Sequence, residues 1–170
     1  MKKRHLAIVA TLLLWPGHVG SAGEQAWKKY SNARFGFLLV YPPDLVASPE
    51  PTNGGGREFH SADKQFSVAT AAHFFVPESG DSFEKRWEEE LKVPEVNITY
   101  TKKTDNWYVV SGVSKDGTEF YHKLYRKGSN WAAFEITYPH TQNKRYDRWV
   151  TRIAKEFIPF LAGDYDRLED

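Results

Sequence analysis

The segment Asn106–Tyr138 constrains the fold more than any other part of the chain, because it has the pattern of three strands joined by two tight turns. The stretches 106–115, 118–127 and 130–138 are rich in aromatic and β-branched residues, which favour strands. Asp116-Gly117 and Gly128-Ser129 separate these stretches, and two-residue links of this kind close β-hairpins. The centre of the fold is therefore predicted to be an antiparallel sheet.

Four more strands are predicted: Arg34–Tyr41, Arg57–Ser61, Gln65–Phe75 and Asn97–Lys103. Pro42-Pro43 ends the first of them, and residues 62–64 suit a hairpin between the second and third. In the third, alternate residues form one largely apolar face: Phe66, Val68, Thr70, Ala72 and Phe74. Ala69 and Ala71 on the opposite face are small, so we expect a helix to lie close to them.

A first helix is predicted over 81–93, before Pro94. Asp81 is the expected N-cap, and Glu84 three residues later completes a capping-box pattern. The apolar residues recur every fourth position: Phe83, Trp87 and Leu91. Two opposite-charge pairs have the same spacing: Lys85–Glu89 and Arg86–Glu90.

A second helix is predicted over 142–160. Its apolar residues fall on one face at spacings of three and four: Tyr146, Trp149, Val150, Ile153 and Phe157. Its basic residues fall mainly on the other face, which we interpret as solvated rather than as a polyanion site: Lys144, Arg145, Arg148, Arg152 and Lys155. Because hairpin-joined strands alternate with helices, the predicted class is α+β, an antiparallel β-sheet flanked by helices.

The N-terminus has the pattern of a secretory signal peptide over residues 1–22. Lys2, Lys3 and Arg4 precede a short apolar run, and Gly20 and Ala22 form a small-residue cleavage site. The run is too short to span a bilayer, which takes about 20 apolar residues, so no transmembrane anchor is expected once the leader is removed. We expect cleavage near Ala22, a periplasmic or secreted protein, a single domain over 26–162 and an acidic tail over 163–170.

Composition excludes several classes of function. Removing 22 of the 170 residues leaves 148, with 20 basic and 22 acidic residues and a net charge of −2, which gives no electrostatic case for nucleic acid. The chain has no cysteine, so thiol catalysis and thiolate metal sites are excluded.

The stretch 52–61, TNGGGREFHS, is the main candidate for a ligand-binding loop. It matches neither the phosphate-binding Gly-x-x-x-x-Gly-Lys-Ser/Thr string nor the dinucleotide Gly-x-Gly-x-x-Gly fingerprint. The favoured interpretation is a flexible turn whose glycines take positive φ before a strand. The alternative is a loop that faces a ligand, and its binding candidates are Asn53, Arg57 and His60.

No other sequence motif indicates a catalytic or metal-binding site. Gly-x-Ser-x-Gly, His-x-His and His-Glu-x-x-His are absent. The histidines at 60, 73 and 122 fall on different predicted strands, with an order in space that the sequence leaves open, so a metal site is not favoured. We therefore expect no catalytic residue, no metal and no cofactor.

The opening YSNARFGFLLVYPPDL, residues 30–45, resembles the start of PsbP-like domains. The matching residues are Tyr30 and Asn32, then Phe35-Gly36-Phe37, then Tyr41-Pro42. The hairpin 107–123 and the closing segment 146–160 are similar to those of secreted bacterial relatives. The resemblance implies the Mog/PsbP-like α/β/α sandwich. Plant members are extrinsic subunits of photosystem II, one eukaryotic relative binds a small GTPase, and bacterial members carry a further carboxylate where this chain has Gly55.

Two hypotheses of function remain. The favoured one is a non-enzymatic domain that binds a protein partner or a small ligand in the cell envelope. The alternative is an envelope hydrolase with dispersed residues near the loop Gly54–Gly56, and it predicts that Arg57 and His60 converge on one cleft.

Overall fold

The computed structural model describes residues 26–161, so the predicted signal peptide and acidic tail lie outside the described part of the chain. Its strands are Lys28–Asn32 (β1), Phe37–Tyr41 (β2), Val46–Ala47 (β3), Gly56–His60 (β4), Ser67–Phe74 (β5), Val96–Lys103 (β6), Trp107–Ser114 (β7), Thr118–Lys127 (β8) and Asn130–Pro139 (β9). The helices are Phe83–Glu90 (α1) and Asn143–Glu156 (α2), with short 3-10 turns at Pro77–Ser79 and His140–Gln142. None of the helices within residues 26–161 has the length and apolar character that crossing a bilayer requires.

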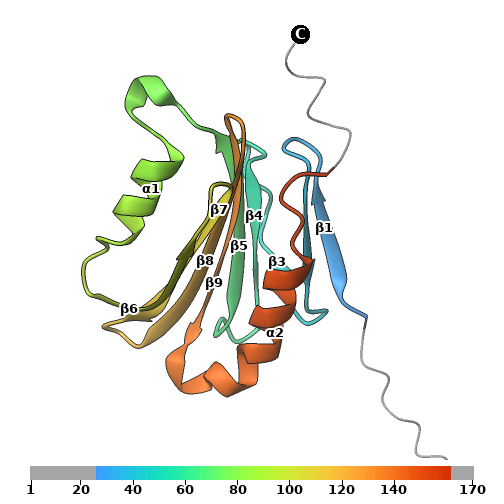
Figure 1. The fold of residues 1–170 in the computed structure, drawn as a ribbon. Coiled ribbons are helices and arrows are strands. Elements are labelled where there is room, and N and C mark those ends of the chain that lie inside the picture. Colours follow the sequence, from blue (N-terminus) through green and yellow to red (C-terminus); the bar gives the residue numbers. More distant parts are fainter. Residues whose placement is uncertain (1–25, 162–170) are drawn as a thin grey trace, which may run out of the picture.

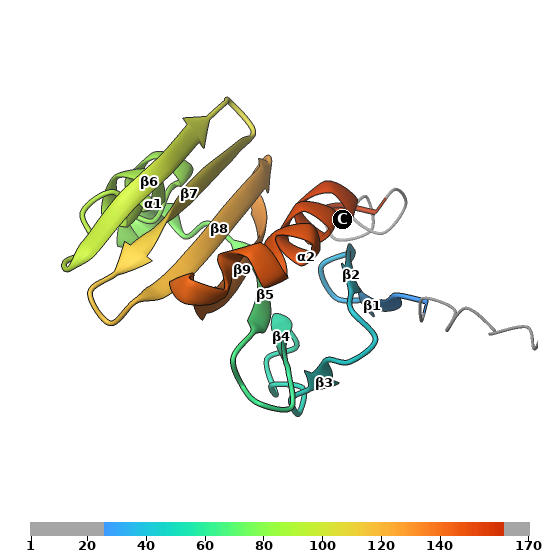
Figure 2. The same ribbon diagram turned by 90° about the horizontal axis from the view of Figure 1, so that it is seen from below.

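Seven strands form one antiparallel sheet in the order β3-β4-β5-β9-β8-β7-β6, and β1 and β2 form a separate hairpin. Figure 1 shows α1 on one side of the sheet, and α2 with the β1–β2 hairpin on the other. The view from below in Figure 2 shows the same arrangement, with α2 between the sheet and β1–β2. The predicted α+β class, an antiparallel sheet flanked by helices, is confirmed.

The larger core lies between the sheet, α2 and the β1–β2 hairpin. The predicted apolar face of α2 is confirmed, because Tyr146 and Ile153 are fully buried. The helix ends at Glu156 rather than at 160, and Phe157 directly after it is 5% exposed. The Phe157 ring lies 4.9 Å from Phe134 of β9 and 5.9 Å from Phe37 of β2. A single helix therefore joins the sheet to the hairpin through aromatic packing.

The smaller core lies under α1, where Phe83 packs on four buried residues of β7, β8 and β9: Tyr108, Val110, Leu124 and Ala133. Glu90 at the end of α1 accepts a hydrogen bond of 3.1 Å from the Tyr108 hydroxyl. The same carboxylate oxygen lies 2.5 Å from Nδ1 of His122 on β8. Burial, followed by the charge of Glu90, raises the pKa of Tyr108, so its hydroxyl remains a donor.

The predicted cap of α1 is wrong by one residue. Ser82 is the N-cap, and its side chain accepts a hydrogen bond of 3.1 Å from the backbone N–H of Lys85. Asp81 instead pairs with Arg86, so the expected Arg86–Glu90 pair does not form, whereas Lys85 and Glu89 do approach to 3.9 Å. Tertiary contacts override local spacing here, because the sheet offers Glu90 the partners Tyr108 and His122.

The helix expected over Ala69 and Ala71 is also absent. Among the described residues α1 packs over β7, β8 and β9 rather than β5, which leaves Ala71 exposed and Ala69 half-buried. Phe74, expected on the buried face of the same strand, is 38% exposed because it stands at the strand's end. Within residues 26–161, no helix therefore covers the face of β4 and β5 on the α1 side.

Candidate functional site

We use the name open strip for this uncovered face of β4 and β5. Side chains alternate along a strand, so directly paired residues share a face. The pairs on the α1 side are Gly56 with Ala71, Glu58 with Ala69, and His60 with Ser67. The side chains of the open strip are thus small and apolar at one end, and polar at the other end.

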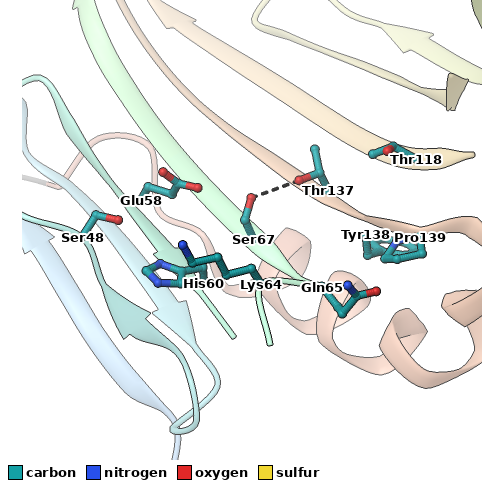
Figure 3. A pocket seen from close by; sticks show the side chains of 10 residues that line it. All are labelled: Ser48, Glu58, His60, Lys64, Gln65, Ser67, Thr118, Thr137, Tyr138 and Pro139. Carbon is teal, nitrogen blue, oxygen red and sulfur yellow. Dashed lines mark hydrogen bonds between the residues drawn. The ribbon is translucent and has the colours of Figure 1, made fainter. Parts of the chain in front are cut away.

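A polar cavity of about 520 Å³ lies at the His60 end of the open strip (Figure 3). Figure 3 shows side chains of β4, β5, β8 and β9 around it, and the hydroxyls of Ser67 and Thr137 lie 3.0 Å apart. Its polar lining includes Ser48, Glu58, His60, Lys64, Ser67 and Thr137. Both hydrogen-bond donors and acceptors line this cavity, as a ligand with hydroxyl or amide groups requires.

A second cavity of about 460 Å³, the alanine groove, lies at the other end of the strip. Glycine and alanine residues of the loop, β4 and β5 line it, together with Pro49, Pro51 and Trp131. The Trp131 Nε1 is buried and has no hydrogen-bond partner among the described residues. Both cavities include Ser48 and Glu58, so they adjoin one another along the strip.

The glycine loop, Gly54–Gly56, forms one wall of the alanine groove. Hydrogen bonds connect this loop to the rest of the domain. Asn32 is 3% exposed, and its Nδ2 donates to the Gly54 carbonyl at 2.9 Å. The Gly55 carbonyl accepts from the Ala72 N–H at 2.6 Å. Of the three glycines only Gly54 has positive φ, at 60°. The predicted turn before a strand is present, but only Gly54 takes the expected positive φ, and hydrogen bonds to Asn32 and Ala72 hold the loop.

Asn53 and Arg57 border the alanine groove, and both side chains are engaged in local bonds. The Asn53 Oδ1 accepts from the Gly55 N–H at 3.0 Å, and the Asn53 carbonyl accepts from the Arg34 guanidinium. The Arg57 Nε donates to the Ser48 carbonyl at 2.7 Å. These bonds shape the wall of the groove.

His60 lines the polar cavity and not the groove. Arg57 and His60 stand three residues apart on β4, so their side chains project from opposite faces of the strand. The structure brings Asn53 and Arg57 to the same groove, and it does not bring Arg57 and His60 to one cleft.

Of the other histidines within residues 26–161, His73 lines the alanine groove, whereas His122 and His140 line neither cavity. His122 contacts Glu90, the His140 Nδ1 lies 2.8 Å from Glu119, and the His73 ring lies 5.9 Å from Phe35. Among residues 26–161, no group of three His, Cys, Asp or Glu side chains is placed to hold a metal ion.

Sequence reasoning missed Glu58, Ser67 and Trp131 as residues of the site. Alternation along β5 puts Ser67 on one face with Ala69 and Ala71, and the pairing of Glu58 with Ala69 across β4 and β5 adds Glu58 to that face. Trp131 could not be placed there, because its proximity to β5 comes from the pairing of His73 with Trp131 across β5 and β9.

Arg86 holds α1 against the rim of the groove. Its guanidinium stacks 4.3 Å over the Trp131 ring, while its Nε and Nη2 donate to the Asp81 carboxylate at 2.6 and 2.9 Å. These two bonds form a fork between Arg86 and Asp81. Such a bidentate ion pair is stronger than a single charge-assisted hydrogen bond. Asp81 therefore fixes the cation that covers one face of Trp131.

Asp81→Asn is expected to lower the free energy of unfolding by about 1 kcal/mol at pH 7, since it weakens this fork. The Arg86 hydrogen bonds hold the pKa of Asp81 below its usual range. The stabilisation is therefore complete above the unfolded pKa of about 3.9, and it is lost as pH falls through the lower folded pKa. Urea denaturation at successive pH values measures the difference, which should shrink in acid. Asp44→Asn, at an exposed position, should change little at any pH, and a pH-independent loss in Asp81→Asn would contradict this account.

Comparisons with known proteins bear on the fold. No protein-family model and no curated protein sequence matches the chain significantly. The solution structure of cyanobacterial PsbP (CyanoP) from Synechocystis sp. is similar, with a TM-score of 0.60 at 11% identity, over 85% of this chain and 99% of that one. A crystal structure from Bacteroides thetaiotaomicron has a TM-score of 0.49 at 16% identity, over 80% of this chain and 49% of that one. The CyanoP likeness spans nearly all of the described residues, and the chain has the PsbP-like fold.

Proposed function

We propose that the chain is a non-enzymatic binding domain of the cell envelope, which holds a protein partner or a small ligand against the open strip. The observation that carries the proposal is the uncovered sheet face of β4 and β5, hollowed by two adjoining cavities of about 520 and 460 Å³. Cavities of this size with a few polar groups are typical of ligand sites.

The floor of the alanine groove suits close approach. A ligand or an extended segment can lie near the backbone where the floor side chains are Ala69 and Ala71 and where Gly56 has none. Trp131 also lines the groove and adds aromatic contact area for a ligand. The polar cavity beside it supplies Glu58 and His60 as further hydrogen-bonding groups.

The likeness to cyanobacterial PsbP supports a non-enzymatic role of the PsbP type, and the leader pattern over residues 1–22 supports export to the periplasm or beyond. The hydrolase hypothesis loses its geometric support, because Arg57 and His60 do not share a cleft. Asn53, Arg57 and His60 therefore enter the proposal as residues around a binding surface.

Ala71→Trp tests the proposal by filling the groove from its exposed floor. The mature protein, immobilised and incubated with an envelope extract, is expected to retain a specific protein or small molecule that mass spectrometry quantifies. The Ala71→Trp variant should retain at least about tenfold less, a loss of about 1.4 kcal/mol of binding.

Arg148→Trp places the same side chain on an exposed position of α2 and should retain the wild-type amount. Equal retention by the two variants would contradict binding at the strip. Saturable turnover of a hydrolase substrate that Ala71→Trp abolishes would contradict the non-enzymatic assignment.

A further inference from the structure

The other face of the sheet carries two lysines that have no carboxylate partner among residues 26–161. On this side α2 makes its main contacts with β2, β8 and β9, and Lys102 on the outer strand β6 is exposed. Lys102 of β6 and Lys123 of β8 both pair with Val109 of β7, so the three side chains form one row across the strands. We call this row the lysine face. Val109 between the two lysines is only 2% exposed.

Aromatic rings, not carboxylates, position both ammonium groups. Lys102 Nζ lies 5.5 Å and Lys123 Nζ 4.7 Å from the Trp107 ring centroid, and Lys123 Nζ also lies 4.8 Å from that of Tyr125. Within the described part of the chain, neither lysine forms an ion pair. A cation–π contact holds an ammonium group but leaves its charge uncancelled.

The surroundings of Lys123 disfavour its charged form. Burial, and then the charge of Lys102, lowers the pKa of Lys123. The two ammonium groups therefore repel each other, and an anion between them would relieve that repulsion.

A cavity of about 480 Å³ adjoins the lysine face, between β7, β8 and α2. Its lining includes Ser111 and Tyr121, which form the next cross-strand pair after Val109 and Lys123. Ser111 and Lys123 are thus diagonal neighbours, about 7–8 Å apart. On the α2 side the cavity is lined by Asp147, Thr151 and Lys155.

The polar groups that line this cavity can form hydrogen bonds with hydroxyl groups of a ligand. The Glu119 carboxylate in it is already engaged, with His140 Nδ1 at 2.8 Å. Asp147 has no ion pair among residues 26–161, so its carboxylate can accept hydrogen bonds from a ligand. Ser111 and Thr151 can both donate and accept.

We propose that this face binds a phosphate ester of a polyhydroxylated molecule, with the phosphate between Lys102 and Lys123 and the hydroxyl-bearing body in the cavity beside Asp147. The two ammonium groups match a dianionic phosphate, and the carboxylate, hydroxyls and aromatic rings match a sugar-like body. The same chemistry occurs in a free sugar phosphate and in a glycerol phosphate headgroup of a lipid. The lysine face lies on the opposite side of the sheet from the open strip and is independent of it.

The test titrates the mature protein with glucose 6-phosphate, glucose and inorganic phosphate by isothermal calorimetry. Glucose 6-phosphate should bind saturably, and glucose and inorganic phosphate should each bind at least about tenfold more weakly, since each lacks one half of the contacts. Lys123→Met removes the charge and keeps an apolar stem, and it should weaken binding of the ester about tenfold or more. Lys123→Arg should retain most of the affinity.

Lys127→Met, on an exposed position of the same strand, is the matched control and should bind as the wild type does. Its unfolding midpoint and that of Lys123→Met show whether each variant folds. Phosphatidylglycerol vesicles form a further arm: binding that Lys123→Met abolishes and glucose 6-phosphate displaces would place the phosphate on a lipid.

Absence of saturable binding by both the ester and the vesicles would overturn the proposal. Equal affinity of the folded Lys123→Met variant and the wild type would overturn it as well. Inorganic phosphate binding as tightly as the ester would overturn the assignment of the cavity to the ligand's body.

Discussion

Gly56→Ala is expected to lower the free energy of unfolding by about 3 kcal/mol. A Cβ atom at this position would lie 1.9 Å from the Thr70 carbonyl oxygen and 2.6 Å from its carbon. Both atoms belong to the backbone of β5, so relief requires β4 and β5 to separate, and that disrupts their hydrogen bonds. Urea denaturation followed by tryptophan fluorescence measures the change.

Gly128→Ala is the matched control for this substitution. Gly128 has φ of 58°, and no atom lies within 4 Å of its would-be Cβ, so the substitution costs only the left-handed backbone conformation, about 1 kcal/mol. If Gly56→Ala lost no more stability than Gly128→Ala, the close contact between β4 and β5 would be refuted.

Asn32→Ala should be nearly as damaging, with an expected loss of about 3 kcal/mol. The Asn32 Oδ1 accepts from the Phe35 N–H at 2.8 Å, and its Nδ2 donates to the Gly54 carbonyl at 2.9 Å and to the Tyr30 hydroxyl at 3.2 Å. Alanine would remove the Asn32 partner of the Phe35 N–H and of the Gly54 carbonyl, at a position that is only 3% exposed. Amide hydrogen exchange should accelerate at Phe35 and around Gly54–Gly56, and urea denaturation measures the stability loss.

Ser31→Ala, at the exposed neighbouring position, should leave stability and exchange unchanged. A stable Asn32→Ala protein with slow exchange in the glycine loop would show that other contacts hold the loop.

The Tyr30 and Asn32 residues that carry the sequence resemblance thus have a structural role. Asn32 ties the β1–β2 turn to the glycine loop, and the Tyr30 hydroxyl donates to Glu50 at 3.1 Å. The pattern of three glycines suggested a ligand loop, and the structure shows that Gly54 supplies a turn and Gly56 a close strand contact. The loop therefore forms one wall of the alanine groove.

The predictions that held depend on local pattern. β8 has the predicted bounds Thr118–Lys127, since a two-residue turn flanks each end and fixes its register. The apolar face of α2 is where its spacing placed it. β1 and β3 were missed, because Lys28–Asn32 has no apolar alternation and Val46–Ala47 is only two residues long.

Two predicted features failed, one through a local ion pair and one through contacts distant in sequence. Asp81 has the chemistry of an N-cap, but Arg86 binds it and Ser82 takes its place. Ala69 and Ala71 have the size expected beneath a helix, but α1 packs over Tyr108 and Leu124 instead. The open strip arises from that displacement, so no spacing within β5 could have revealed it.

If the open strip binds a partner or ligand of the cell envelope, a photoreactive side chain on the strip should crosslink to that molecule. Benzoylphenylalanine can be placed either at Ala71 on the strip or at Arg148 on α2, both exposed positions. We expect a discrete crosslinked product from Ala71 in an envelope extract, and none from Arg148. The same product from both positions, or from Arg148 alone, would contradict the claim.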